Sequence, residues 1–386
     1  MAMGPRGFAA SEFQNRVSRA QKMMQDSDLS ALLLTTEPEI RYFTGFLTRF
    51  WESPTRPWFL VVPSAGDPIA VIPAIGAHLM RQTWIADIRT WQAPDYTDDG
   101  IGPLCDALQE VIGNGGRIGT PDQMESHVRI PLSAFRQLEQ RLRPARIVGD
   151  DTIMRRLRLI KSDAEIAKIA TACTIADRAF ARVPEIAAAG TPLGTVFRAF
   201  QGLCLAEGAD WVPYLAGAAG PDGYGDVISP ATDTPLAVGD VLMLDTGLVW
   251  DGYFCDFDRN FSIGPPTASA KAAHDKLMAA IEAGCDAAKP GAVASDIFHA
   301  MNDIVNPGGT GSDAGRLGHG LGMQLTEWPS IIAGDHTPLV PGMVLTLEPG
   351  VQSGADSLMV HEENIVITDT GARFLSDFQP AMRRIN

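Results

Sequence analysis

Three aspartates, Asp245, Asp256 and Asp258, lie in two strand-like runs that the pair Asp251–Gly252 separates. An Asp-Gly pair between two such runs is typical of a two-residue hairpin turn. Side chains two apart on a strand share a face, so this hairpin would project all three carboxylates from one face. Three carboxylates there repel one another unless a cation or a shifted pKa relieves them. We therefore predict a metal site, and the alternative is a solvated acidic surface.

The turn also predicts the register of the hairpin. With two residues in the turn, Trp250 faces Tyr253 and Asp245 faces Asp258. Gly247 leaves room on the acidic face because glycine has no side chain. A bulge in either strand would shift this register.

Further candidate ligands lie in apolar stretches downstream. Glu348 follows an apolar run, and Glu362 and Glu363 lie inside another. A carboxylate in such a strand is costly without a partner, and adjacent glutamates point to opposite faces, so only one enters a given site. His319 lies among glycines that let the backbone approach closely. A lone histidine is more often structural, but inward carboxylates nearby favour its role as a ligand.

These residues stand in motifs that resemble the ligand motifs of the pita-bread family, which includes creatinase, prolidase, Xaa-Pro aminopeptidase and methionine aminopeptidase. The motifs are DTG at 245–247, GYFCDFDR at 252–259, GHGLG at 318–322, PGMVLTLEPG at 341–350 and EENIVIT at 362–368. The resemblance implies the metal ligands Asp245, Asp256, His319, Glu348 and Glu363. It also implies two divalent ions, most plausibly Mn²⁺, with Co²⁺, Zn²⁺ or Fe²⁺ as alternatives. Such ions suit a set of carboxylates with one imidazole.

Length and patterning predict two domains, since 386 residues exceed what one core usually supports. Residues 1–157 alternate strand-like and helix-like segments, which indicates an α/β domain. The segment IRYFTGF at 40–46 resembles the N-terminal domain of creatinase and prolidase. Ser162 and Glu165 form a capping box that begins a helix early in the second domain, residues 158–386. Antiparallel strands with helices predict an α+β fold there, and the resemblance implies a pita-bread catalytic domain.

The chain also departs from the family pattern. The peptidases have a histidine upstream of the first aspartate motif, and this chain has none between His127 and His274. Thr326 stands where a second family histidine is expected. Both histidines normally hold the scissile amide, and losing one such donor costs a few kcal/mol of barrier. We therefore expect weak hydrolysis of Xaa-Pro dipeptides, unless Thr326 or another group such as Tyr224 takes over.

Other positions suggest roles in catalysis and substrate binding. The resemblance implies that Glu348 relays a proton from water to the leaving nitrogen, and Thr326 and His361 are the other catalytic candidates. Asp258 stands where the family usually has threonine, and His361 where peptidases often have arginine. The extra negative charge suggests a cationic substrate, and the alternative is that Asp258 pairs with an arginine such as Arg259 or Arg316. The candidate substrate-binding residues are Asp258, Arg49, Trp51 and Tyr224.

The leading hypothesis is therefore a dinuclear metal-dependent hydrolase of a C–N bond, related to Xaa-Pro aminopeptidase and prolidase. The alternatives are a small-molecule amidohydrolase or amidinohydrolase, like ectoine hydrolase or creatinase, and a non-catalytic pita-bread binding module. The substrate would be a small molecule or a short peptide. The resemblance also implies a homodimer. The cluster Arg49–Trp51 is cationic and aromatic, which is typical of an interface or a ligand contact, and the alternative is packing against its own domain.

Composition excludes some classes of protein. A net charge of −15 argues against nucleic acid and anionic membranes as partners, because both need clustered Lys and Arg. Five scattered cysteines without a CxxC motif favour a reducing compartment. No stretch approaches the length of a membrane span or of a signal-peptide core. We therefore expect a cytoplasmic protein.

Overall fold

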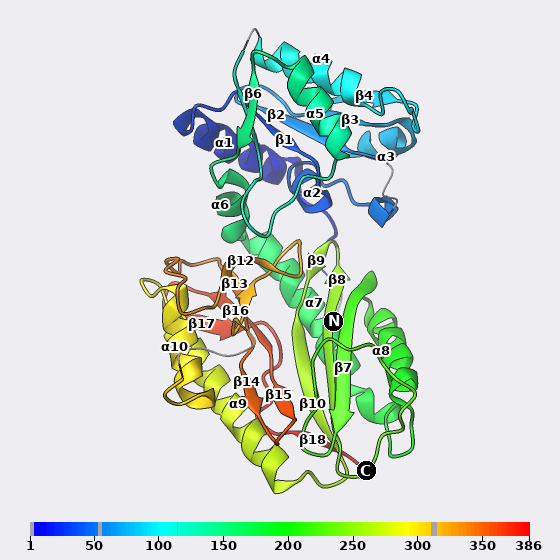
Figure 1. Cartoon of the computed structure of the whole chain (residues 1–386), viewed down its shortest axis with the longest axis vertical. Helices are drawn as coiled ribbons and strands as arrows, with labels where there is room; N and C mark the ends of the chain where they lie inside the picture. The colour runs from blue at the N-terminus through cyan, green and yellow to red at the C-terminus, as the bar shows by residue number, and fades with distance from the viewer. Residues whose placement is uncertain (1–3, 53–55, 114, 310–314) are drawn as a thin grey trace. The chain divides into compact units, whose positions relative to one another are not determined.

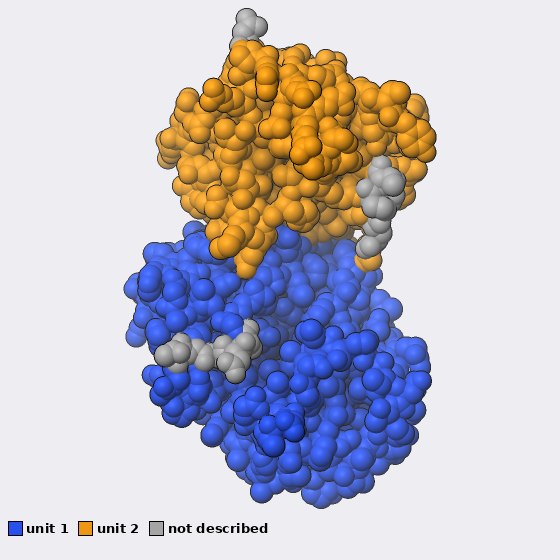
Figure 2. All heavy atoms as spheres, viewed as in Figure 1, with its two compact units in different colours: residues 1–5, 159–386 blue, residues 6–158 orange. Residues whose placement is uncertain are grey.

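The computed structural model describes residues 4–52, 56–113, 115–309 and 315–386. The chain divides into two compact units (Figure 2). One comprises residues 6–158, and the other comprises residues 1–5 and 159–386.

The first unit is an α/β domain around a six-stranded mixed sheet, in the order β4-β3-β2-β1-β5-β6. Its strands are β1 (Ala31–Leu34), β2 (Phe59–Pro63), β3 (Ile69–Pro73), β4 (Asp87–Trp91), β5 (Arg117–Thr120) and β6 (Arg146–Gly149). Its helices are α1 (Ala10–Asp26), α2 (Glu37–Thr44), η1 (Phe50–Glu52), η2 (Ala74–Gly76), α3 (Ala77–Met80), α4 (Ile101–Ile112), α5 (Leu132–Arg141) and α6 (Ile153–Leu159). Apolar residues of α4 and α5 pack on β1, β2 and β3. The predicted α/β class is confirmed.

The second unit contains two sheets and a short ribbon. The first sheet has the order β18-β10-β8-β7 with β9 beside β8, and the second has the order β12-β11-β13-β16-β17. The strands of the first sheet are β7 (Trp211–Gly220), β8 (Val241–Trp250), β9 (Tyr253–Phe254), β10 (Phe257–Ile263) and β18 (Arg383–Ile385). Those of the second sheet are β11 (His319–Gly320), β12 (Glu327–Ser330), β13 (Val344–Leu347), β16 (Glu363–Ile367) and β17 (Ala372–Phe374), and the ribbon pairs β14 (Gly350–Gln352) with β15 (Leu358–Val360).

Helices back both sheets of this unit (Figure 1). They are α7 (Asp163–Ala181), η3 (Val183–Glu185), α8 (Leu193–Glu207), α9 (Ala268–Ala287) and α10 (Ala294–Val305). Helices α7 and α8 contact β8 and β7, whereas α9 contacts β13, β14, β15 and β17. The predicted capping box is present, since the Glu165 N–H donates to the Ser162 side chain and the Glu165 carboxylate accepts from the Ser162 N–H. The predicted α+β class is confirmed.

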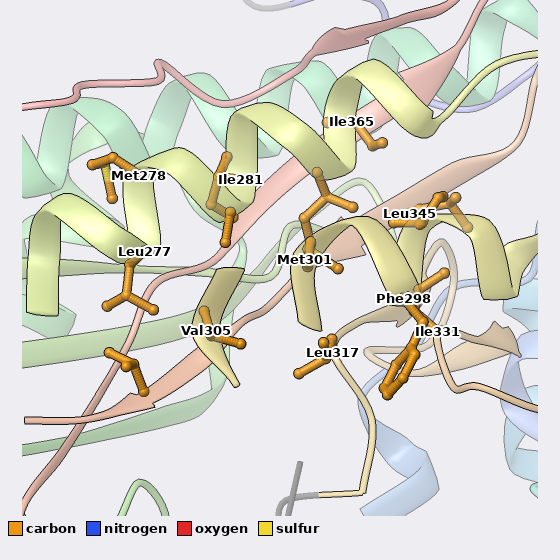
Figure 3. Close-up of a cluster of buried hydrophobic side chains, with 14 of the residues drawn as sticks. Leu277, Met278, Ile281, Phe298, Met301, Val305, Leu317, Ile331, Leu345 and Ile365 are labelled. Carbon is orange, nitrogen blue, oxygen red and sulfur yellow. The ribbon is translucent and has the colours of Figure 1, made fainter. Parts of the chain in front are cut away.

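An apolar core joins α9 and α10 to strands of both sheets. Figure 3 shows Leu277, Ile281 and Met301 from the helices in one cluster with Leu345 and Ile365 from the second sheet. Val241 and Met243 of β8 belong to the same cluster. This core fixes the sheets against each other, because close-packed side chains resist displacement.

The hairpin of β8 with β9 and β10 has the predicted turn and register. Asp251 and Gly252 have φ angles of 49° and 81°, as a type I′ turn requires. Trp250 pairs with Tyr253, and Asp245 pairs with Asp258. The prediction is confirmed, and residues 255 and 256 form a short break between β9 and β10.

None of the helices in the described part of the chain is both long enough and apolar enough to cross a membrane.

The turn glycine should be sensitive to substitution. We expect Gly252→Ala to lower the free energy of unfolding by about 1–2 kcal/mol, because a Cβ is strained at positive φ. Gly202→Ala is a matched control, since Gly202 is exposed inside α8 with no atom near its would-be Cβ. That change should be neutral or stabilising by up to about 1 kcal/mol. Urea unfolding of both variants checks this, and equal effects would contradict it.

Candidate metal centre

The first sheet contributes three acidic side chains to the candidate site, two from strands β8 and β10 and one from the break before β10. Asp245 in β8 pairs with Asp258 in β10, and Asp256 lies in the break just before β10. Their exposed fractions are 8%, 1% and 4%. The alternative of a solvated acidic surface is therefore wrong, because these carboxylates are enclosed.

The second sheet contributes the remaining groups. His319 begins β11, Glu348 follows β13, and Glu362 directly precedes β16. The N–H of Glu348 donates to the carbonyl of Leu317 at 2.9 Å, which joins the end of β13 to the segment before His319. His319 and Glu362 are 3% and 2% exposed, so this half of the group is buried as well.

Ligand atoms of Asp256, His319 and Glu362 lie within 4.8 Å of one another. His319 Nε2 is 3.4 Å from Asp256 Oδ2, and His319 Nδ1 is 2.8 Å from the carbonyl of Gly320. Nδ1 therefore carries the proton and donates it to this carbonyl, which leaves the lone pair of Nε2 facing the carboxylates. Metal-binding histidines are oriented in this way.

The carboxylates of this group raise one another's pKa. Burial and then the charge of Asp245 raise the pKa of Glu348 to about 7, and burial raises that of Asp245 to about 6. Burial, followed by the neighbouring carboxylates, places the pKa values of Asp256 and Glu362 well above their ordinary range. Burial lowers the pKa of His319 to about 4. The group thus holds protons unless a cation replaces them.

The unpartnered atoms of the group fit divalent metal ions. Asp245 Oδ1 and Glu362 Oε1 are buried and have no hydrogen-bond partner within the described ranges. Such atoms are costly unless a ligand satisfies them. Several carboxylate oxygens with one neutral imidazole match the donors that Mn²⁺ and related ions accept. The residues present therefore fit the metal ions that the sequence implies.

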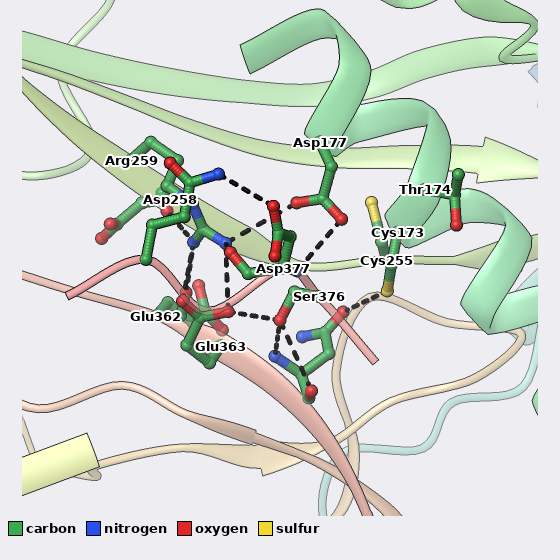
Figure 4. A network of polar contacts seen from close by, with 12 residues as sticks. Cys173, Thr174, Asp177, Cys255, Asp258, Arg259, Glu362, Glu363, Ser376 and Asp377 are labelled. Carbon is green, nitrogen blue, oxygen red and sulfur yellow. Dashed lines mark hydrogen bonds and ion pairs between the residues drawn. The ribbon is translucent and has the colours of Figure 1, made fainter. Parts of the chain in front are cut away.

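The structure brings Glu362 to this group and turns Glu363 away from it. Glu363 Oε1 lies 3.1 Å from Arg259 Nη1 and accepts from His361 Nε2 at 3.0 Å. Ser376 donates to the other oxygen of Glu363, and Figure 4 shows this network around Arg259. Burial alone would raise the pKa of Glu363, but Arg259, His361 and Ser376 bring it below the ordinary value. The geometry therefore corrects the expectation for Glu363, because its charge is already satisfied by Arg259.

Three other predicted site residues lie behind the group. His361 Nδ1 is 3.5 Å from Asp258 Oδ1, and the side chain of His361 is fully enclosed. Arg259 contacts the Asp258 backbone carbonyl rather than its carboxylate. Tyr224 accepts the N–H of Val360 at 2.7 Å and is 2% exposed. Asp258, His361 and Tyr224 are thus internal contacts of the catalytic unit, and a substrate role for them stays a prediction.

The remaining predicted residues divide between the two units. Thr326 precedes β12, and its hydroxyl accepts from Arg316 Nη2 at 3.3 Å. Arg49 is exposed in the first unit. Trp51 lies in the same unit, with its ring centroid 5.6 Å from that of Trp58. A role for Arg49 or Trp51 in binding or in an interface stays a prediction.

Sequence reasoning missed two residues that hold the ligands. Tyr214 in β7 donates to Asp245 Oδ2 at 3.0 Å. Asn364 in β16 accepts the N–H of Asp256 at 3.0 Å and donates to its carbonyl. No signal marked Tyr214, since it lies far upstream. Asn364 is two residues after Glu362, so the two side chains share a face of the strand. A polar pair at this spacing could have indicated that this face points to the site.

Comparisons with known proteins show the family to which both parts of the chain are similar. Residues 167–369 match the model of metallopeptidase family M24, and residues 16–160 match the creatinase/prolidase N-terminal domain. The probable dipeptidase PepE of Mycobacterium tuberculosis is 29% identical over 374 residues, which cover 96% of each chain. The Xaa-Pro dipeptidase of Pyrococcus furiosus is 30% identical over 365 residues, which cover 94% of this chain and 98% of that one.

Solved structures share the fold. Dipeptidase PepE from Mycobacterium ulcerans matches with a TM-score of 0.84 at 27% identity, covering 98% of this chain and 99% of that one. Prolidase from Thermococcus sibiricus matches with a TM-score of 0.86 at 22% identity, covering 98% and 100%. At the lower identity, the likeness concerns the fold alone.

The two adjacent glutamates should behave differently when neutralised. We expect Glu362→Gln to lose at least one of two bound Mn²⁺ ions and to keep the fold, because it removes a ligand and a repelling charge. Glu363→Gln should retain metal but lower the free energy of unfolding by about 3 kcal/mol, because it removes the nearer of the two carboxylates that pair with buried Arg259 and leaves only Asp177 at 3.6 Å. Elemental analysis and urea unfolding check both. Metal loss confined to Glu363→Gln would contradict this assignment.

The stability of the metal-free protein should fall as pH rises from 7 to 8.5. Because the folded pKa of Glu348 is about 7 and those of Asp256 and Glu362 are raised, folding keeps protons that the unfolded chain has released. This contribution to stability is lost as pH passes through the folded pKa values. The buried histidines have the opposite effect below about pH 6.5. Burial lowers their pKa values, so the unfolded chain binds protons that the folded protein does not, and their contribution to stability falls as pH falls.

Bound metal should remove this pH dependence, because it replaces the protons. Thermal melting with EDTA and with Mn²⁺ measures it, and we expect the difference in Tm to widen with pH across this range. A difference that shrinks from pH 7 to pH 8.5 would show that the buried carboxylates do not retain protons in the folded, metal-free protein as described.

Proposed function

The chain belongs to metallopeptidase family M24, and on that premise we propose that it is a dinuclear metal-dependent dipeptidase. The observation that carries the proposal is the largely buried group of donors that both sheets bring together. Its members are Asp245, Asp256, His319, Glu348 and Glu362. Among the relatives, one is named a probable dipeptidase and another an Xaa-Pro dipeptidase, which supports a dipeptide substrate.

The proposed chemistry is hydrolysis of the amide bond. When bound, the two ions would polarise the scissile carbonyl and make water acidic enough to lose a proton near neutral pH. Glu348 lies on the less buried side of the group, and it accepts the proton of the attacking water and delivers it to the leaving nitrogen. Burial raises its pKa to about 7 in the metal-free protein, and bound cations would lower this pKa and leave Glu348 ionised, as a proton acceptor must be.

The supporting residues keep this machinery in place. Tyr214 holds one oxygen of Asp245, and Asn364 clamps both backbone groups of Asp256. Gly320 fixes the tautomer of His319. Side chains that are already held by such hydrogen bonds lose little conformational entropy when they bind metal. Mutation of hydrogen-bond partners of metal ligands commonly lowers metal affinity about 10–100-fold.

The two alternative functions have weaker support. The two relatives described above are named as dipeptidases rather than as amidohydrolases of creatine or ectoine type. A non-catalytic binding module has no need of five metal donors, whose burial costs free energy. The peptidase therefore remains the function that the geometry supports best.

We also propose the identity of the metal, the assembly and the compartment. Mn²⁺ suits a site dominated by carboxylates. All five cysteines are free thiols, which favours a reducing cytoplasm. The homodimer rests on the resemblance to the creatinase and prolidase branch, and light scattering at micromolar concentration tests it.

A substrate panel tests the proposed function. Purified protein loaded with Mn²⁺ is incubated with Ala-Pro, Ala-Leu, creatine and ectoine, and released amino acids are quantified. We expect dipeptide hydrolysis that EDTA abolishes, with Ala-Pro slow because the family histidines are absent. Full activity in excess EDTA, or turnover of creatine or ectoine without dipeptide hydrolysis, would overturn the proposal.

Glu348→Gln should lower kcat by about 10²–10⁴-fold, since it removes the proton carrier. Its thermal melting should remain close to that of the wild type, because the change also relieves repulsion. Glu282→Gln is the matched control, since Glu282 is exposed on α9, and it should retain full activity. Equal kcat values for the Glu348 and Glu282 variants would exclude Glu348 from the reaction.

A further inference from the structure

Arg316 brings a positive charge to the edge of the acidic group. Burial raises the pKa values of Asp256 and Glu348, and the charge of Arg316 opposes both shifts. The backbone fixes its position, because the carbonyl of Leu317 accepts the N–H of Glu348 at 2.9 Å. The side chain is half-buried, so part of it is open to solvent.

Thr326 orients this guanidinium. Arg316 Nη2 donates to Thr326 Oγ1 at 3.3 Å. Thr326 in turn is held by its neighbour Glu327, which starts β12 and pairs with Gly320 of β11. The carboxylate of Glu327 accepts the N–H of Met323 at 2.9 Å and lies 3.2 Å from Lys161 Nζ. The loop that carries Thr326 is thereby anchored at both ends.

A dipeptide makes a specific demand on such a site. Its α-carboxylate oxygens lie three bonds from the scissile nitrogen, so they must enter the same region as the ligand carboxylates. A negative charge brought beside several others is repelled unless a cation meets it. A guanidinium is suited to this task, because its five N–H donors allow it to hold Thr326 and to bind a carboxylate with two parallel bonds.

Resting on the proposed dipeptidase function, we propose that Arg316, positioned by Thr326, binds the α-carboxylate of the substrate and restricts hydrolysis to dipeptides. Arg316 is then a specificity-determining residue and Thr326 a positioning residue. A longer peptide presents a neutral amide at this place, which cannot form the charged pair with the guanidinium.

A comparison of a dipeptide with its own amide tests the proposal. The dipeptide that the wild type cleaves best is compared with its C-terminal amide, which has the same scissile bond and lacks the negative charge. We expect Arg316→Ala to lower kcat/KM for the dipeptide about 10–100-fold and for the amide by less than about threefold. Thr326→Ala should lower the same ratio less, and Arg316→Lys should be intermediate because it loses the bidentate geometry.

The controls separate recognition from structure. Arg198→Ala removes an exposed arginine on α8 and should leave the ratio unchanged. Metal content and thermal melting identify any variant that fails to fold. If Arg316 only neutralises the ligand carboxylates, Arg316→Ala lowers dipeptide and amide hydrolysis equally, and that result overturns the proposal.

A binding measurement gives an answer without turnover. Calorimetric titration of the Mn²⁺-loaded protein with proline and with prolinamide should give at least about tenfold tighter binding of proline, and Arg316→Ala should abolish the difference. If dipeptides are not hydrolysed but this difference is present, the dipeptidase function fails and the carboxylate site stands. Equal binding of both compounds by the wild type overturns the carboxylate site.

Discussion

Mutual repulsion among buried carboxylates from two sheets is the constraint on which the rest of this structure depends. Asp245 and Asp256 come from the first sheet, and Glu348 and Glu362 come from the second. Asp245, Asp256 and Glu362 are almost enclosed and Glu348 is half-buried, so water screens their charges poorly. Only a firm scaffold can hold such a group together, and the apolar core that α9 and α10 share with both sheets provides it. The same repulsion favours the binding of divalent cations, because each carboxylate is attracted to a cation that lies between them.

Two neighbouring glutamates show how one strand serves two purposes. Glu362 faces the metal group, whereas Glu363 faces Arg259 and Ser376 on the other side. The ion pair of Glu363 therefore fixes the start of β16 from behind. Asn364 continues the same division, since its side chain returns to the metal face and holds the backbone of Asp256. The proposed ligands are thus positioned by residues that lie outside the proposed ligand set.

Much of this arrangement could be predicted from the sequence. The Asp-Gly turn determined the register that places Asp245 opposite Asp258, and local turn chemistry suffices for that inference. The metallopeptidase family and both fold classes are confirmed by the comparisons and the structure. The choice between Glu362 and Glu363 could not be made from alternation alone, because alternation says only that one of them enters. Asn364 could have indicated the choice. It is polar and lies on the same face of the strand as Glu362, whereas Ile365 and Ile367 lie on the face of Glu363. Tyr214 reaches the group only through tertiary packing, so no local pattern indicated it. Arg316 was expected only as a possible partner of Asp258, whereas the structure shows it donating to Thr326.

The most direct test of this account is to locate the metal ions. Crystals grown with Mn²⁺ give anomalous differences at the manganese absorption edge, and these place each ion without reference to any assumed ligand. The account predicts two peaks within coordination distance of Asp245, Asp256, His319, Glu348 and Glu362, with Glu363 still paired to Arg259. A structure without peaks in this group, or with Glu363 as a ligand in place of Glu362, would contradict it.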